Sequence, residues 1–426
     1  MPPPEVTATA AGRTRRTTAA GRPEFLAIIA MAMALAALGI DAMLPAFDEI
    51  RASFGLAPDS TQVAGLITTY FFGLAVGQLV FGPLSDRVGR RPMLWAGFAL
   101  YGVGALAAAL SPALGFALVA RFVWGLGASG PRAVAMAIIR DSYEGEQMSR
   151  AYSLVMAMFI LVPVVGPTIG AAVVAVSSWR VLFVACAVAV AALLAWSLRL
   201  PETLPPHRRR PAGPRDLVAV ARVIAGQRAT LGYTLALTAI FGAFSSYLAS
   251  SEAIFDQAFG RRDAFPLLFG GLAATMGLAM VTNAKAVMAF GTARLSRLVL
   301  VVYVGFGVVF VAVSFSRGGH PPLALFLVAL AGLLCCFAFL TPNLNTLAMA
   351  PLGHVAGSAA SVLGAVQTAV GAAVGTVLDR AFDGTPRALA VGFLASGVLA
   401  WAAIRLLVSE PVPGPTDERA PSASPA

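Results

Sequence analysis

The sequence predicts an all-α membrane protein whose twelve transmembrane helices form two bundles of six. Three observations lead to this fold class. Hydrophobic residues make up 58% of the 426 positions and charged residues 12%, so the chain has too little polar surface to cover a soluble globule. The apolar residues form long continuous segments, not the apolar and polar alternation of a membrane barrel. The charged residues gather between those segments.

Twelve apolar segments are long enough to span a membrane, because a helix needs about 20 residues to cross roughly 30 Å of hydrocarbon. The first begins too late and runs too long for a cleaved signal peptide, so we expect it to be retained. In chain order the predicted spans are 25–47, 62–82, 93–111, 114–138, 151–176, 180–199, 229–250, 265–289, 297–315, 321–344, 354–378 and 386–408.

A long basic loop divides these spans into six and six, as in transporters built from tandem repeats with the substrate site between the halves. The predicted organisation is a disordered tail at 1–22, a bundle at 23–204, a cytoplasmic linker at 205–228, a second bundle at 229–410 and a disordered tail at 411–426.

The distribution of lysine and arginine predicts the orientation. Loops on the side of the termini carry 21 basic residues and the opposite loops carry 7, which places both termini in the cytoplasm. Spread over loops that face anionic lipid, these residues account for the net charge of +10 without a nucleic-acid partner. The three cysteines lie inside apolar spans without metal-like spacing, so we expect no metal site.

The stretch "FGPLSDRVGRRP" at 81–92 concentrates charges and helix breakers between two spans. We expect Gly82 to let the second span end in close contact with a neighbour, and Pro83 to start a new turn. Gly89 permits a sharp reversal. Asp86 is then available to a helix N-terminus or to an arginine on the cytoplasmic face.

This order of residues resembles the loop 2–3 signature of the major facilitator superfamily. The resemblance implies a cytoplasmic latch that holds the two halves together in the outward-facing state. The implied gate residues are Gly82, Asp86, Arg87, Gly89, Arg90 and Arg91.

Other stretches resemble the bicyclomycin and chloramphenicol resistance group of drug/proton antiporters. "GIDAMLPAF" at 39–47 is similar to its helix 1 signature, and "ARFVWGLGAS" at 120–129 to the arginine signature of helix 4, with Trp124 where the family commonly has glutamine. "VPVVGPTIGA" at 162–171 is similar to the antiporter signature of helix 5, with valine and alanine in place of the outer glycines. Uptake carriers usually lack this signature, so the resemblance favours efflux. Its motif residues are Pro163, Gly166, Pro167 and Gly170.

Few ionisable residues lie well inside the predicted spans. Asp41 is the only acid there, and Arg121 and Arg132 are the only basic residues. Charges inside a membrane are costly and usually face a cavity, although a structural ion pair is an alternative. Helix geometry places Asp41 and Arg121 at a common depth of roughly 9 Å below the outer boundary. We therefore predict that Asp41 couples transport to protons and that Arg121 biases its protonation.

Arg132 lies on the same face of the fourth span as Arg121, roughly 16 Å deeper. Two interpretations stay open for it, a packing role with bonds to carbonyl groups and a role in the cavity. Other polar or polarisable residues are candidates for the substrate cavity, each equally suited to an interhelical hydrogen bond. With Asp41 they are Met43, Tyr70, Gln78, Tyr247, Asn283, Asn343 and Gln367.

The predicted function is proton-coupled export of lipophilic drugs or antibiotics across the bacterial inner membrane by alternating access. We expect a monomer driven by the proton gradient without a cofactor. An exporter of an endogenous metabolite, such as a sugar or amino-acid derivative, would carry the same motifs. The latch and Asp41 argue against a receptor or scaffold, and no nucleophile, metal cluster or phosphate loop indicates an enzyme.

Overall fold

The computed structural model describes residues 23–209 and 214–408. Within these ranges the chain is helical and contains no strand. Twelve of the helices are long and apolar enough to cross a membrane. The predicted fold class is therefore confirmed. The expected terminal tails at 1–22 and 411–426 lie outside the described residues.

The N-terminal bundle is built around α6, against which both α4 and α5 pack along their length. The first span bends after Asp41, so that a short turn and α3 continue it. The helices are α2 (Pro23–Asp41), α3 (Phe47–Ser53), α4 (Gly65–Val88), α5 (Arg90–Ala109), α6 (Leu114–Ser142), α7 (Gly145–Val176) and α8 (Trp179–Ser197).

The C-terminal bundle is built around α10, which packs against α13, α14 and α15. The short helix α9 precedes this bundle and contacts α14 and α10. The helices are α9 (Pro214–Gly226), α10 (Arg228–Ala253), α11 (Phe265–Phe290), α12 (Thr292–Phe315), α13 (Leu323–Met349), α14 (Ala356–Arg380) and α15 (Arg387–Leu407).

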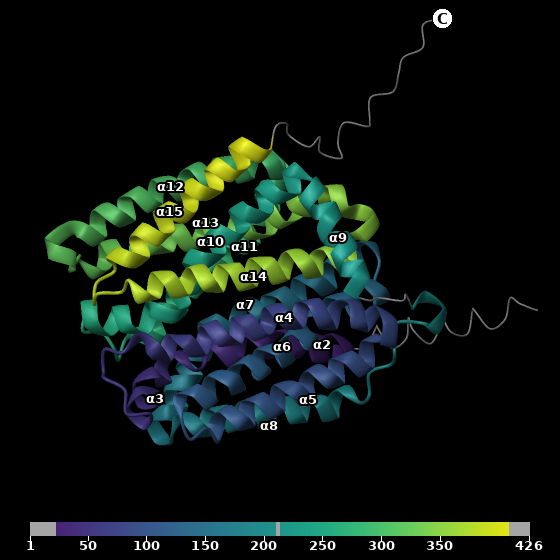
Figure 1. Cartoon of the computed structure of the whole chain (residues 1–426), viewed down its shortest axis with the longest axis horizontal. Coiled ribbons are helices and arrows are strands. Elements are labelled where there is room, and N and C mark those ends of the chain that lie inside the picture. Colours follow the sequence, from purple (N-terminus) through teal and green to yellow (C-terminus); the bar gives the residue numbers. More distant parts are fainter. Residues whose placement is uncertain (1–22, 210–213, 409–426) are drawn as a thin grey trace, which may run out of the picture.

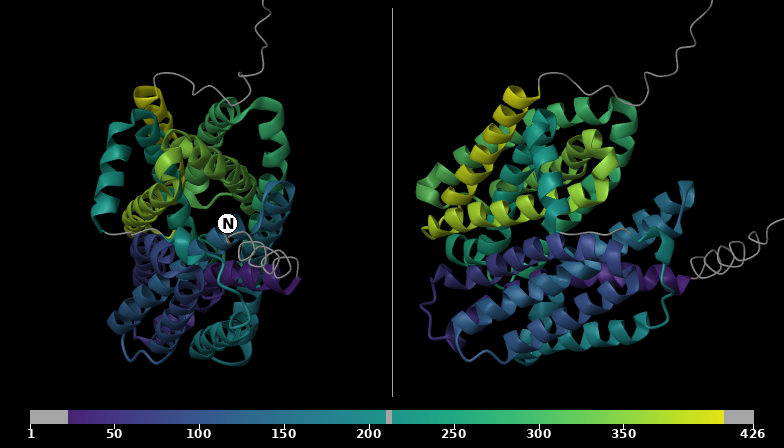
Figure 2. Two further views of the ribbon diagram at one scale, coloured as in Figure 1. Left: turned by 90° about the vertical axis from the view of Figure 1, so that its right-hand side faces the viewer. Right: turned by 45° about the vertical axis from the view of Figure 1, so that its right-hand side comes forward.

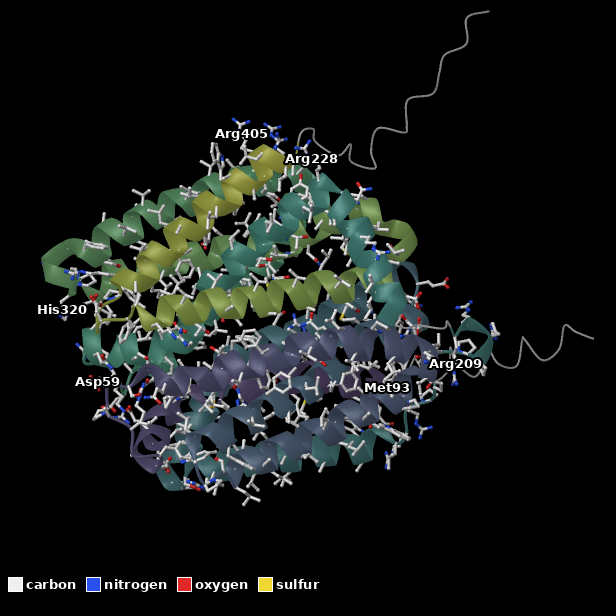
Figure 3. The ribbon with its side chains drawn as sticks, viewed as in Figure 1. Asp59, Met93, Arg209, Arg228, His320 and Arg405 are labelled. Atoms are coloured by element: carbon white, nitrogen blue, oxygen red, sulfur yellow. The ribbon has the colours of Figure 1, made fainter. Side chains whose placement is uncertain are left out.

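The two bundles form the two halves of the molecule and lie one above the other in Figure 1. Helix α4 packs against α14, and α7 packs against α11, so two pairs of helices join the halves. Figure 2 shows the same separation from two further directions. We call the left side of Figure 1 the α3 end and the right side the α9 end. In Figure 3, Asp59 and His320 mark the α3 end and Arg209 marks the α9 end.

One predicted boundary is wrong. Helix α4 continues to Val88, so Gly82 does not end it and Pro83 lies inside it. The prediction followed the apolar residues, whereas the helix runs on through the polar segment 85–87, beyond the hydrocarbon. Transmembrane helices tolerate an internal proline because neighbouring groups satisfy the freed backbone carbonyl. The reversal occurs at Gly89, whose φ of 126° favours glycine.

The predicted linker contains a helix that the search for spans did not identify. Helix α9 is amphipathic, with Val220 and Ile224 buried against the bundle and Val218 exposed. The linker is thus partly ordered against the C-terminal half.

Candidate functional site

Asp41 is the last residue of α2 and is 4% exposed. Its carboxylate makes no ion pair or hydrogen bond with the described residues. Two glycines of α7 bring that helix against this point. A Cβ at Gly166 would lie 3.2 Å from the Cβ of Asp41, and a Cβ at Gly170 would overlap the carbonyl oxygen of Ala42. The helix 5 motif therefore packs directly against the end of α2 that carries the carboxylate.

Arg121 of α6 is fully buried beside the same end of α2. Its Nη1 donates to the carbonyl oxygen of Gly39 at 2.8 Å, and its Nε donates to that of Leu66 on α4 at 3.1 Å. It forms no ion pair with Asp41. In this state Arg121 is connected to the carboxylate only through the backbone of α2.

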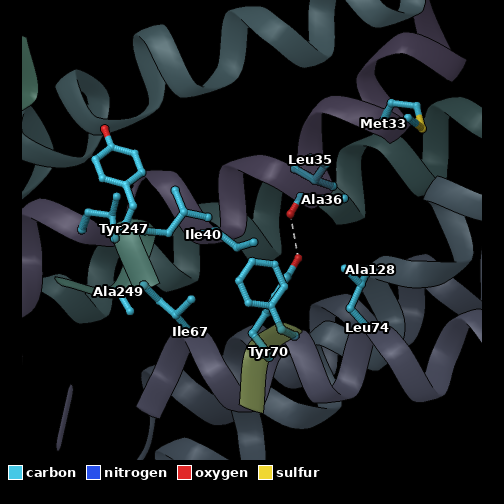
Figure 4. Close-up of a cluster of buried hydrophobic side chains, with 14 of the residues drawn as sticks. Met33, Leu35, Ala36, Ile40, Ile67, Tyr70, Leu74, Ala128, Tyr247 and Ala249 are labelled. Atoms are coloured by element: carbon cyan, nitrogen blue, oxygen red, sulfur yellow. Dashed lines mark hydrogen bonds between the residues drawn. The ribbon is translucent and has the colours of Figure 1, made fainter. Parts of the chain in front are cut away.

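Aromatic rings enclose the rest of the Arg121 guanidinium. Its Cζ lies 4.4 Å from the ring centre of Tyr70 and 4.7 Å from that of Trp124. The Tyr70 hydroxyl donates to the carbonyl oxygen of Ala36 at 2.7 Å, drawn in Figure 4. Trp124 stands where the helix 4 signature commonly has glutamine, so it supplies a ring in place of an amide. Nη2 of Arg121 has no partner among the described residues, so one buried donor remains free.

Tyr247 is a residue of the C-terminal half that lies near Asp41. It belongs to α10, is 3% exposed and lies close enough to Asp41 for electrostatic interaction. Its ring stacks on Phe269 of α11 with the centroids 5.5 Å apart. Figure 4 shows Tyr247 and Tyr70 on opposite sides of Ile40. Asp41 therefore lies where α2, α7 and α10 meet.

The other predicted cavity residues divide into bonded and unbonded groups. Asn283 and Asn343 donate to each other at 3.2 and 2.9 Å, which joins α11 to α13 inside the C-terminal half. Gln78 donates to Thr368 at 3.3 Å and so joins α4 to α14. Met43 is buried, and Gln367 is half-buried without a hydrogen bond to the described residues.

The predicted latch lies at the α9 end and is formed within the N-terminal half. Arg90 is buried, and its Nη1 contacts Asp86 at 2.6 Å and Ser85 Oγ at 2.7 Å. Its Nε donates to Asp141 at 2.9 Å. Arg87 is exposed. Of the two partners that the sequence allows for Asp86, the structure shows the arginine.

The helix N-terminus beside the latch has a different acid. Glu202, in the segment after α8, accepts from the backbone N–H of Arg90 at 3.0 Å and of Arg91 at 3.1 Å, which caps α5. Gly82 faces the opposite half, because a Cβ there would overlap Ser361 Oγ of α14. At this end the halves touch through small residues.

The sequence did not predict an ion-pair cluster at the α3 end. Arg51 is 4% exposed, and its Nη2 lies 2.9 Å from Oε2 of Glu252 on α10. Asp48 forms ion pairs with both Arg51 and Arg262. Asp48 and Arg51 belong to the N-terminal half, Glu252 and Arg262 to the other. The only signal in the sequence is opposite charge just beyond two spans, which does not reveal that they meet.

Asp379 is a further buried acid near this cluster. It is 6% exposed near the end of α14 and accepts a hydrogen bond of 2.7 Å from Ser246 Oγ. A void of about 10 Å³, the size of one water molecule, has both Arg51 and Asp379 in its wall. Glu252 and Asp379, both near helix ends, are therefore shielded from solvent.

Comparison with known proteins gives consistent matches. The family described as "Major Facilitator Superfamily" matches residues 29–376. The MFS-type transporter YdgK of Bacillus subtilis is 30% identical over 82% of this chain and 86% of its own. A bicyclomycin resistance protein homolog of Haemophilus influenzae is 27% identical over 83% of this chain and 88% of its own. The partially occluded inward-open structure of the xylose transporter XylE from E. coli shares the fold, with a TM-score of 0.68, 14% identity and coverage of 90% and 98%.

Proposed function

Because this chain belongs to the major facilitator superfamily of membrane transporters, we propose that it exports lipophilic drugs or antibiotics in exchange for protons. It is a multi-pass protein of the bacterial plasma membrane. One observation carries the proposal: Asp41 is buried, without a cation partner in the part of the chain that the structure describes, where the helix 5 motif of α7 and the second half of the molecule meet.

Asp41 is the proposed proton carrier. A charged carboxylate without a partner is costly in apolar surroundings, so binding a proton is the simplest way to neutralise it. Arg121 holds the carbonyl of Gly39, two residues away, and α7 packs on the other side. A tilt of α2 therefore changes the surroundings of the carboxylate and its distance from Arg121. A drug and a proton that favour different conformations of the two halves displace each other, which is sufficient for exchange.

Alternating access sets the direction of transport, because the two sides of the membrane open in turn. The Lys/Arg distribution makes the α9 end cytoplasmic, so the ion pairs at the α3 end close the outer side and the structure corresponds to an inward-facing state. Outward opening then requires Arg51 and Glu252 to separate. The loop that carries Asp86 and Arg90 closes the opposite end, as its resemblance to the family latch implies. No cofactor is needed because the proton gradient supplies the energy.

Asp41→Asn tests the proposal in proteoliposomes with an imposed pH gradient and in an efflux-deficient host exposed to a panel of antibiotics. We expect uphill accumulation to be lost, with drug binding retained, and Asp41→Glu to keep part of the activity. Asp59→Asn, at an exposed acid of the α3 end, is the matched control. Uphill pumping by Asp41→Asn would place coupling elsewhere, with Glu252 the next carboxylate to examine. A wild type that confers no resistance would favour the metabolite exporter.

A further inference from the structure

Arg132 is an exposed charge in an otherwise covered stretch of α6. Between Arg121 and Arg140 of α6, it is the only side chain that is exposed. Its neighbours one turn away on the same face, Ala128 and Met136, are buried and half-buried. A position facing lipid would expose these neighbours too, because residues four apart share a face of a helix. The guanidinium therefore enters a local opening.

This opening is internal. Many protein atoms lie around the Arg132 guanidinium, although water can reach its side chain. It lies ten residues before the end of α6 at Ser142, about 15 Å into the bundle. Because ion pairs close the α3 end, water reaches Arg132 from the α9 end. An arginine that is accessible at this depth is placed to line the cavity of the proposed function.

Helix α2 contributes an apolar wall at the same depth. Met31 is 42% exposed and is the only exposed residue of α2 beyond Pro23. It lies eight residues from Gly39, about 12 Å along the axis, while Arg132 lies about 16 Å from Arg121, which binds Gly39. The covered stretches of α2 and α6 thus each expose one side chain, and these are at similar depths. A polarisable thioether and a guanidinium at one depth suit an amphiphilic molecule.

No protein acid neutralises Arg132. Among the described residues it forms no ion pair or hydrogen bond, and the ionisable groups near it are the phenols of Tyr70 and Tyr152. Asp41 is roughly 20 Å away along the bundle axis. A packing arginine would instead use its donors on carbonyl groups, as Arg121 does. The five donors of Arg132 are left for a molecule in the cavity.

We propose that Arg132 is the anion-binding group of the substrate cavity, and that the transported molecules are amphiphilic organic anions whose carboxylate or equivalent group it binds. This inference rests on the central cavity of the proposed function and specifies its substrate class. The guanidinium offers a planar pair of donors that matches a carboxylate, and Met31 receives the apolar body. Because Asp41 is distant, the bound anion and the proton carrier do not repel each other at close range.

Accessibility is tested first, in a cysteine-free background. Arg132→Cys is labelled with a membrane-impermeant maleimide in inverted vesicles, with Ser129→Cys, a buried neighbour, as the control. We expect Arg132→Cys to react from the α9 side and Ser129→Cys to stay unlabelled. An unreactive Arg132→Cys would show that this side chain does not reach the cavity and would overturn the proposal.

Substrate class is tested by equilibrium binding to the purified full-length protein. The probes are pairs of aryl carboxylic acids and their amides, namely naphthoic, cinnamic and biphenylcarboxylic acid. We expect the acids to bind more tightly than the amides. Arg132→Gln should raise the Kd of the acids roughly tenfold to a hundredfold and leave that of the amides unchanged, because a hydrogen bond to a charged group is lost. Arg132→Lys should keep part of the preference.

Arg140→Gln, at an exposed arginine of the same helix, is the matched control and should change neither Kd. The proposal is overturned if no acid binds more tightly than its amide, or if the preference survives in Arg132→Gln. Equilibrium binding needs no proton gradient, so Asp41→Asn protein should keep the preference. The binding experiment therefore tests the role of Arg132 independently of proton coupling.

Discussion

The two ends of the molecule use the same kinds of residue in different ways. At the α3 end, Arg51 binds Glu252 of the opposite half and Asp48 binds Arg262, so charge connects the halves. At the α9 end, Arg90 binds Asp86 and Asp141, and all three belong to one half. An ion pair across the halves holds one end closed. An ion pair within one half shapes a loop whose charges can still change partners.

Contacts between the halves at the α9 end are of another kind. Gly82 packs against Ser361, and Asp86 lies near Gly357, where a Cβ would be 3.9 Å from its Oδ2. No ion pair among the described residues crosses between the halves there. In the alternating access that we propose, closing this end forms new contacts between the halves, while opening the α3 end breaks existing ion pairs. The balance between the two states depends on that exchange.

The largest expected effect comes from breaking the charge contact at the α3 end. Arg51→Gln leaves the buried carboxylate of Glu252 without its cation, which costs on the order of 3 kcal/mol, whereas Glu252→Gln leaves Arg51 paired with Asp48 and costs less. We expect this end to open in most molecules and transport to fall more than tenfold. Spin labels at Asp59→Cys and His320→Cys, exposed positions on opposite halves, measure the opening as a longer distance.

Arg180→Gln is the control, because Arg180 contacts Ser111 and Trp179 within one half. Exchanging the charges with Arg51→Glu and Glu252→Arg should restore closure only in part, because the new carboxylate lies beside Asp48. Unchanged distances in both single variants would show that the cluster does not hold the end closed.

The sequence predicted the spans well because hydrocarbon imposes a length and an apolar composition on each of them. It did not predict the extension of α4 to Val88, nor α9, since both contain polar residues, which also form helix outside the apolar segments. Axial position could likewise be calculated for Asp41 and Arg121 from helix rise. The hydrogen-bond partner of Arg121 could not be calculated from the sequence, because it depends on the direction of the side chain and on the rotation of the helix. That partner is a carbonyl oxygen, which every residue carries.

Long-range pairing was the least predictable part. Arg51 and Glu252 are 201 residues apart, and their contact exists only after the two halves pack. Opposite charges near many span ends make this pair no more evident in the sequence than others. Arg132 illustrates the same limit. Its face on α6 follows from the helical period, but only the packed structure shows that it is exposed while its neighbours are covered.

An intermediate effect is expected from the packing that lies between the two ends. Gly170→Ala forces a side chain into the carbonyl oxygen of Ala42, whereas Gly166→Ala brings one within 3.2 Å of the Cβ of Asp41. The overlap at Gly170 is far more severe than the tight contact at Gly166, so Gly170→Ala should lower transport severalfold and Gly166→Ala should lower it less. Gly166→Leu should uncouple transport by admitting a proton leak.

Proteoliposomes carrying each variant report both effects, as substrate exchange and as the decay of an imposed pH gradient. Gly271→Ala of α11, with nothing within 4 Å of its Cβ position, is the control. Equal exchange by Gly170→Ala and Gly166→Ala would contradict the assigned packing, and a Gly166→Leu protein no leakier than wild type would reject the role in sealing.

The smallest effect is expected at the latch, where the contact is within one half and partly exposed. Asp86→Asn removes a pair that contributes at most about 1 kcal/mol at a half-exposed site, so the state seen here should persist. The closed α9 end should become two- to fivefold less populated, with transport reduced and protein abundance unchanged. Spin labels at Glu146→Cys and Arg294→Cys, exposed on opposite halves, measure that population, and Glu144→Gln is the control. If the distances across the α9 end match wild type while transport still falls, Asp86 acts in another step and the two ends are not alternative sites of closure.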